Sequence, residues 1–129
     1  MEKPKTFGIK KLNTKKYQAP NWAGWYKEQV WVKYRYAFLR YNPTCYACGI
    51  KATVVDHIMP HKGDRKLFEQ LDNHAPLCAF CHNKITALFD KKMTKGNKPE
   101  MYMKKLTWLA DMRLHNDVNT KIKVLTRFE

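Results

Sequence analysis

The stretch VVDHIMPHKGD, residues 54–64, places two histidines and two aspartates directly behind a short apolar run. It lies between two C-x-x-C motifs, CYAC at residues 45–48 and CAFC at residues 78–81. A β-branched run of this kind is typical of a strand, and Pro60 and Gly63 end it. The polar residues that follow therefore form either a charged surface turn or a set of groups gathered around a metal ion.

The two C-x-x-C motifs predict a structural zinc site formed by Cys45, Cys48, Cys78 and Cys81. Zinc in such sites prefers four thiolates in a closed tetrahedron, and each C-x-x-C turn offers two sulfurs. A redox dithiol and unligated buried thiols are the alternatives, but two pairs without a thioredoxin-like pattern favour zinc. A tetrathiolate site has no open coordination position, so any chemistry must come from other residues.

The charge of the chain indicates a polyanionic partner. Its 25 Lys and Arg against 11 Asp and Glu give a formal net charge of +14, and aromatic residues make up 13%. Lysine and arginine interleaved with aromatics suit nucleic acid, and DNA is the expected partner. No apolar run approaches a membrane span, and the start has no signal-peptide core, so we expect a cytoplasmic protein with reduced thiols.

The length of 129 residues suits one domain with extensions. We expect a basic arm over residues 1–20 and a single domain over 21–129, with a motif core at 45–90 and a helical extension at 97–129. The elements predicted by pattern are helices at 21–42, 81–92 and 99–114, strands at 51–58 and 74–78, one helical turn within 65–71, and a strand in the tail at 120–128.

Four motifs, CYACG, VVDHIMPHKGD, DNHAPLC and CHNKIT, together resemble the HNH endonucleases of the kind that phages and prophages carry. The resemblance covers residues 45–86. It implies an α+β fold, with a small ββα-metal core (the His-Me finger) that has a structural zinc and flanking helices. Two positions differ from the family pattern: His74, where an apolar or aromatic residue is usual, and Ile85, where lysine is common, although Lys84 stands beside it.

The resemblance also implies roles for individual residues. His57 would be the general base that activates water, since imidazole titrates near neutral pH. Asp56 and His82 would hold one divalent catalytic metal, Mg²⁺, Mn²⁺ or a similar ion. Asn73 would support His57, or the loop that carries it, through a hydrogen bond.

Two further polar residues of the motif have open roles. His61 is a third metal ligand, a phosphate contact or a loop residue, and the sequence does not favour one of these. Asp64 follows Gly63 as a turn acid that caps a helix or pairs with Arg65.

We therefore expect a metal-dependent DNA endonuclease that nicks or cuts duplex DNA with weak sequence preference. The main alternative is a non-catalytic zinc-finger module that binds DNA through the same cysteines and basic residues. A nuclease toxin is a third class, but such proteins usually carry a secretion domain. The phage resemblance makes a large-terminase partner an option that one sequence does not test.

Overall fold

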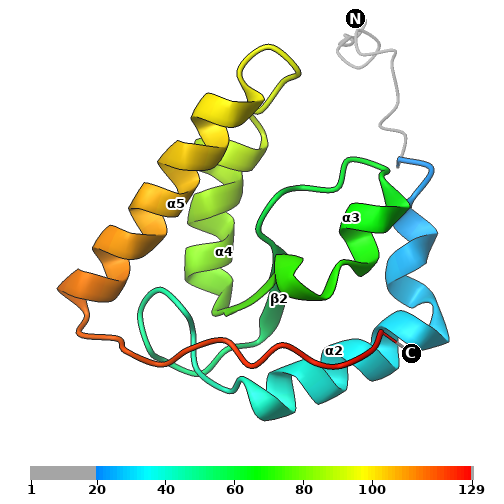
Figure 1. Cartoon of the computed structure of the whole chain (residues 1–129), viewed down its shortest axis with the longest axis horizontal. Helices are drawn as coiled ribbons and strands as arrows, with labels where there is room; N and C mark the ends of the chain where they lie inside the picture. Colours follow the sequence, from blue (N-terminus) through cyan, green and yellow to red (C-terminus); the bar gives the residue numbers. More distant parts are fainter. Residues whose placement is uncertain (1–19, 129) are drawn as a thin grey trace, which may run out of the picture.

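A two-stranded antiparallel sheet lies at the centre of the computed structural model, which describes residues 20–128. Strand β2 (Val54–His57) pairs with β3 (His74–Leu77), and helix α4 (Ala79–Ile85) follows β3 after a single residue. The order strand, loop, strand, helix is the predicted ββα core, so the expected α+β fold is confirmed (Figure 1).

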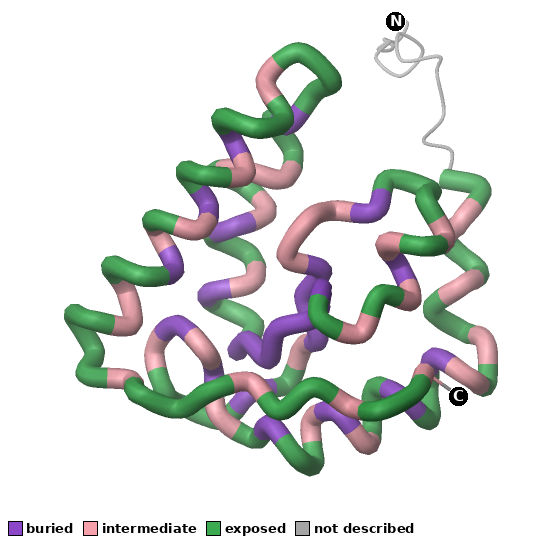
Figure 2. Tube along the Cα trace, viewed as in Figure 1, coloured by how far each residue is buried: buried purple, intermediate pink, exposed green. Residues whose placement is uncertain are grey.

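The register of the sheet sets the orientation of the motif residues. Asp56 lies opposite Ala75, and His57 lies opposite His74. Because successive side chains of a strand point to opposite faces, Asp56 and His57 face different sides of the sheet. Both strands are almost wholly buried, so both faces are covered by other elements (Figure 2).

Further helical segments surround this core. A 3₁₀ segment, η1 (Ala23–Lys27), leads into α2 (Gln29–Tyr41), and α3 (Arg65–Glu69) lies in the loop between the strands. Helix α5 (Lys98–His115) runs beside α4 (Figure 1). The short 3₁₀ turn η2 (Leu71–Asn73) precedes β3, and a π-helical turn, η3 (Thr86–Asp90), extends α4.

Two hydrophobic clusters cover the two sides of the sheet. On one side, Leu77, Ile85 and Leu109 pack with the buried cysteines between the strands, α4 and α5. On the other side, α2 and α3 contribute Trp31, Tyr34, Phe38 and Phe68, which pack with Val55 from β2 (the α2 cluster). Asp56 therefore faces α4 and α5, whereas His57 faces the aromatic side chains of α2 and α3.

The prediction of one continuous helix over residues 21–42 was wrong in its first third. Glu28 has an extended backbone, with φ −65° and ψ 142°, and it separates η1 from α2. The Glu28 carboxylate accepts two hydrogen bonds from Arg65 of α3, at 2.7 and 3.2 Å. Next to this break, the Trp25 and Tyr26 rings pack on the Phe68 ring, with centroids 5.1 and 5.3 Å away.

The predicted tail strand is also wrong: the structure describes residues 120–128 and assigns them no strand. Every third residue of the tail (Ile122, Leu125 and Phe128) packs against the α2 cluster. The Asn42 side chain bonds both backbone groups of Lys123, at 2.7 and 3.0 Å, and so pairs with the tail as a strand edge would. Apart from residue 20, the predicted basic arm lies outside the described residues.

Candidate active site

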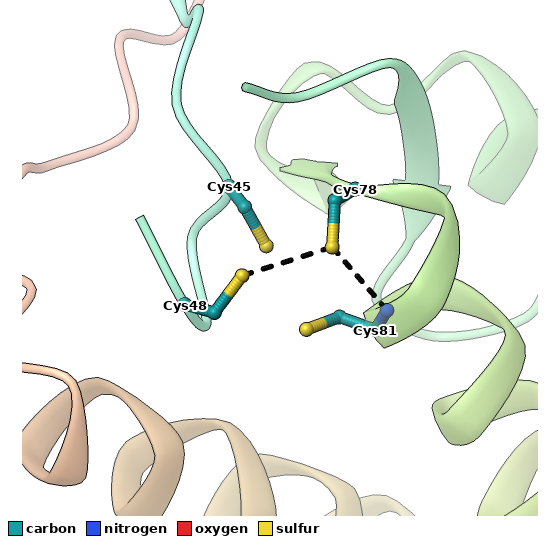
Figure 3. A group of neighbouring side chains, drawn as sticks. All are labelled: Cys45, Cys48, Cys78 and Cys81. Carbon is teal, nitrogen blue, oxygen red and sulfur yellow. Dashed lines mark hydrogen bonds between the residues drawn. The ribbon is translucent and has the colours of Figure 1, made fainter. Parts of the chain in front are cut away.

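The four cysteines converge at one end of the sheet. Cys45 and Cys48 come from the loop before β2, whereas Cys78 is the single residue between β3 and α4, and Cys81 lies in the first turn of α4 (Figure 3). All four Sγ atoms lie within 4.8 Å of one another, and those of Cys48 and Cys78 are 3.7 Å apart. Sulfurs about 2.3 Å from a tetrahedral zinc ion would be about 3.8 Å apart. The cluster therefore fits the predicted zinc site.

The environment of the thiols favours a bound cation. Burial, followed by the neighbouring cysteines, raises the pKa of both Cys48 and Cys81. Four thiolates at this separation repel one another unless a positive charge neutralises them, and zinc supplies that charge. Zinc held here would join the loop before β2 to the start of α4, which fixes both ends of the hairpin.

Asp56 and His82 meet on the α4 side of the sheet. His82 Nδ1 lies 3.2 Å from Asp56 Oδ1, and Asp56 is buried whereas His82 is about one-third exposed. Two ligands at right angles on a hard divalent ion, each about 2.1 Å from it, are about 3.0 Å apart. One carboxylate oxygen and one imidazole nitrogen at this spacing fit the predicted catalytic metal.

A buried lysine from α5 approaches the other oxygen of Asp56. Lys105 Nζ lies 3.1 Å from Asp56 Oδ2 and 3.1 Å from Asp90 Oδ1, and it donates a 3.0 Å hydrogen bond to the His57 carbonyl. Asp56 Oδ2 has this ion pair but no well-aligned hydrogen bond. Lys105 thus shares one positive charge between two carboxylates and leaves Asp56 Oδ1 directed at His82.

Asp90, at the end of η3, is the second acid at this position. Burial raises the pKa of its carboxyl, and the nearby Lys105 ammonium offsets part of that effect. Neither Asp90 nor Lys105 belongs to the residues that the sequence predicted for the site.

His57 is enclosed by aromatic rings on the opposite side of the sheet. Its ring packs beside both Trp31 and Phe68, with centroids 5.5 and 5.1 Å away and planes inclined by 19° and 22°, and these two rings are 4.8 Å from each other. Its Nε2 lies 3.1 Å from the Phe68 carbonyl oxygen, which can only accept, so Nε2 carries the proton. Nδ1 is then the unprotonated nitrogen of the neutral ring and the one that can accept a proton.

Burial, and after it the neighbouring His74, lowers the pKa of His57 to about 3. The expectation of titration near neutral pH is therefore corrected for the DNA-free protein. At neutral pH the ring is uncharged, as a proton acceptor must be, but its affinity for a proton is reduced.

Asn73 supports the loop and does not contact the His57 ring. Its Oδ1 accepts from the Met59 amide at 2.8 Å, and its Nδ2 donates to the Met59 and Leu67 carbonyls at 3.0 and 3.1 Å. It thereby ties the chain just after β2 to α3, one residue before the carbonyl that orients His57. Of the two roles considered for Asn73, the contacts match support of the loop.

His61 lies beside His57, with ring centroids 4.9 Å apart, and both of its ring nitrogens have hydrogen-bond partners within the fold. Its Nδ1 accepts from the Gly63 amide at 3.0 Å, so its Nε2 donates to the Tyr26 hydroxyl at 2.7 Å. Among residues 20–128, the only group of three or more candidate ligands is the cysteine cluster. The structure therefore does not bring His61 together with Asp56 and His82.

The turn after His61 is formed as the sequence suggested. Lys62 and Gly63 both have positive φ, 46° and 92°, and a Cβ on Gly63 would lie 3.0 Å from the Trp22 ring. Asp64 then caps α3 by accepting from the Lys66 and Leu67 amides at 3.0 and 3.4 Å. Its expected capping role is confirmed, and Arg65 pairs with Glu28 and Glu69 instead.

A pocket of about 360 Å³ joins the two sides of this site. Asp56, His57, His61, His82 and Asp90 all line it. The pocket is open to solvent, so a phosphate group could reach the Asp56–His82 pair and His57 at the same time.

Most of the motif residues that line this pocket lie in a stretch that matches a known family. Residues 45–88 match the sequence model of a family described as HNH endonuclease. This stretch is an HNH endonuclease domain. The match confirms the resemblance, but it does not distinguish phage-type proteins from others and gives no support for a terminase partner.

No curated protein and no solved structure matches the chain. The HNH match ends at residue 88, so α5 and its Lys105 lie outside it. Within residues 20–128, no helix is long and apolar enough to cross a membrane.

The burial of Lys105 could have been predicted from its place in the apolar series of α5. Met101, Lys105 and Leu109 are spaced four residues apart, and all three are buried on the same face of α5. A lysine in the apolar series of a helix is seldom fully buried unless it pairs with an acid.

His74, which differs from the usual residue of the family pattern, has a structural role. Its Nε2 donates to the same Phe68 carbonyl as His57, and its Nδ1 accepts from the Tyr34 hydroxyl.

We expect Cys78→Ser to lower the melting temperature by about 10 °C or more, because structural zinc binding contributes several kcal/mol to folding. Serine can still cap α4 as the Cys78 sulfur does, so the change isolates the lost thiolate. Circular-dichroism melting and zinc content by elemental analysis measure both effects. The control is Ala79→Ser, an exposed position one residue later. A Cys78→Ser protein that melts like this control would rule out the zinc site.

We expect Lys105→Met to cost about 3–5 kcal/mol of unfolding free energy, since it leaves two acids without their buried cation. Lys104→Met, at a 58% exposed neighbour on the same helix, should cost less than about 1 kcal/mol. Urea unfolding of both variants gives the comparison. Similar losses in the two proteins would mean that Lys105 does not stabilise the site.

Acid should destabilise the protein through His57. Its pKa of about 3 in the folded state lies below the ordinary 6.5, so its contribution is complete above pH 6.5 and is lost as the pH falls towards 3. Between pH 7 and 5, the unfolding free energy of wild type should fall more steeply than that of His57→Gln, by up to about 1.4 kcal/mol per pH unit. Urea unfolding at constant zinc measures both slopes, and equal slopes would contradict the prediction.

Proposed function

We propose that this protein is a metal-dependent endonuclease that hydrolyses phosphodiester bonds of DNA. One observation carries the proposal: in an HNH domain, Asp56 Oδ1 and His82 Nδ1 lie 3.2 Å apart in the same pocket as His57. A metal-ligand pair beside a proton acceptor supplies the two groups that metal-assisted hydrolysis of a phosphodiester uses. The net charge of +14 supports DNA as the substrate.

Asp56 and His82 would hold the divalent ion, and the two ligands leave most of its coordination sphere to water and substrate. When bound, such an ion neutralises charge that develops on the phosphate and on the leaving oxygen. Lys105 keeps Asp56 Oδ2 engaged at 3.1 Å, so the carboxylate cannot rotate freely away from His82. We assign Lys105 a positioning role on this basis.

His57 would accept the proton of the attacking water at Nδ1. Its Nε2–H bond to the Phe68 carbonyl holds the ring in the required tautomer, and Trp31 and Phe68 hold its plane. A DNA phosphate beside the ring favours its positive form, so substrate binding should raise the low pKa towards the range where a general base works best. Asn73 would act indirectly, because it holds the loop that carries the Phe68 carbonyl and so the orientation of His57.

The basic charge favours weak sequence preference, because phosphate contacts do not read base identity. We propose that the arm over residues 1–20 adds to this charge-driven binding and that residues 21–129 form one nuclease domain, with its motif core at 45–90. Whether the enzyme nicks one strand or cuts both depends on how two strands reach one pocket.

A non-catalytic zinc-binding module that attaches to DNA is the second candidate. It is favoured by one observation: the cysteines alone form a cluster of three or more ligands among the described residues. The two candidates differ in what they predict for cleavage, since a binding module holds DNA without hydrolysing it.

We expect wild type to nick supercoiled plasmid when Mg²⁺ or Mn²⁺ is added, and His57→Gln to lose at least about two orders of magnitude in rate. The glutamine amide can still donate to the Phe68 carbonyl, whereas alanine would leave a cavity beside the Trp31 and Phe68 rings. The matched control is His115→Ala, at an exposed position at the end of α5. Brief treatment with a moderate chelator should stop nicking, and added divalent metal should restore it while the zinc stays bound.

Nicking by His57→Gln within a few fold of wild type would remove His57 from the catalytic role. DNA binding without any nicking by wild type, with either metal, would favour the binding module.

A further inference from the structure

A second hollow, of about 400 Å³, adjoins the pocket of the candidate active site. It lies between α2 and the residues that precede β2, and we call it the α2 groove. Its charged lining residues are Arg35, Arg40 and Lys51, all exposed, and no acidic side chain is among the described residues that line it. The groove is thus a concave surface of one sign of charge, which attracts anions.

The α2 groove is continuous with the active-site pocket. Arg35 and Thr53 line both hollows. Arg35 Nη2 donates a 2.8 Å hydrogen bond to the Thr53 carbonyl, which holds the guanidinium at the junction. A guanidinium has five N–H donors in total, so others are available to a phosphate that passes this point.

The spacing and the walls of the groove suit a sugar–phosphate backbone. Arg35 and Arg40 are five residues apart on α2, a rise of about 7.5 Å, so their charges are spread along the groove and not gathered at one point. Lys51 lies across the groove, and the wall between the cations includes Leu39 and Tyr36, the latter 66% exposed. Cations alternating with apolar surface match a strand of charged phosphates and apolar sugar faces.

We infer that the backbone of one DNA strand leaves the active-site pocket past Arg35 and Thr53 and continues along the α2 groove to Arg40 and Lys51. The inference rests on the proposed nuclease function, and it specifies which surface holds the substrate beside the cleaved bond. The helix α2 lies outside the HNH match at residues 45–88, so the groove joins that domain to a surface contributed by the rest of the chain.

The test is the salt dependence of DNA binding by a double variant, Arg40→Ala with Lys51→Ala. Its control is Lys98→Ala with Lys104→Ala, which removes the same charge from exposed positions on α5, a helix that lines no part of the groove. Fluorescence anisotropy with a labelled duplex, in Ca²⁺ and from roughly 50 to 300 mM salt, gives log Kd against log salt. Circular-dichroism melting checks that both variants fold.

Each phosphate contact contributes about 0.9 to the slope of that plot. The groove variant should therefore lose between about 0.9 and 1.8 from the slope, and its KM for plasmid should rise with its Kd. The α5 control should keep the wild-type slope and activity. Arg40→Glu should weaken binding more than Arg40→Ala, since it places a negative charge in the path of the strand.

Equal slopes for the groove variant and the α5 control, in a wild type that nicks plasmid, would overturn the inference and leave the nuclease function intact. A wild type that fails to nick would instead count against the proposed function. Loss of slope for an RNA duplex but not for DNA would also overturn the inference, because it would assign the groove to another polymer.

Discussion

The fixed ends of one short hairpin are the constraint on which the rest of the structure depends. Cys45 and Cys48 precede β2, and Cys78 and Cys81 follow β3, with all four sulfurs within 4.8 Å of one another. A sheet of two strands is marginal by itself in water, so it needs either such a cross-link or packing against helices. Here helices pack on both of its faces, and zinc held by the four cysteines would add the cross-link and fix the position at which α4 begins. His82, one residue after Cys81, is thereby carried to Asp56.

Successive side chains of β2 point to opposite faces of the sheet, so Asp56 and His57 lie in two different environments, and the proposed chemistry requires both. Asp56 lies on the side where Lys105, Asp90 and His82 supply charge and hydrogen bonds. His57 lies on the side where Trp31 and Phe68 exclude water and keep its ring neutral. A carboxylate that pairs with Lys105 and an imidazole that remains uncharged can thus stand on adjacent residues, since the sheet keeps their surroundings apart.

The flanking helices contribute to the site as well as to the core. Helix α5 lies outside the HNH motif, yet its Lys105 joins Asp56, Asp90 and the His57 carbonyl. Helix α2 buries Trp31 against His57 on one face and exposes Arg35 and Arg40 on another. The motif therefore carries the proposed reacting groups, whereas the surrounding chain controls their charge and orientation.

The sequence by itself determined the ββα order and the grouping of the four cysteines, because strand patterns and C-x-x-C turns depend on local spacing. The cap at Asp64 followed from its position after a glycine turn for the same reason. The pairing of Asp56 with His82, 26 residues apart, was implied only by the resemblance to HNH endonucleases. Tertiary structure alone decided the break at Glu28, the irregular tail held by Asn42, and the two acids that pair with Lys105, since each depends on a partner many residues away. The lowered pKa of His57 belongs with these: burial among rings from α2 and α3 is a property of packing, and no local pattern around His57 encodes it.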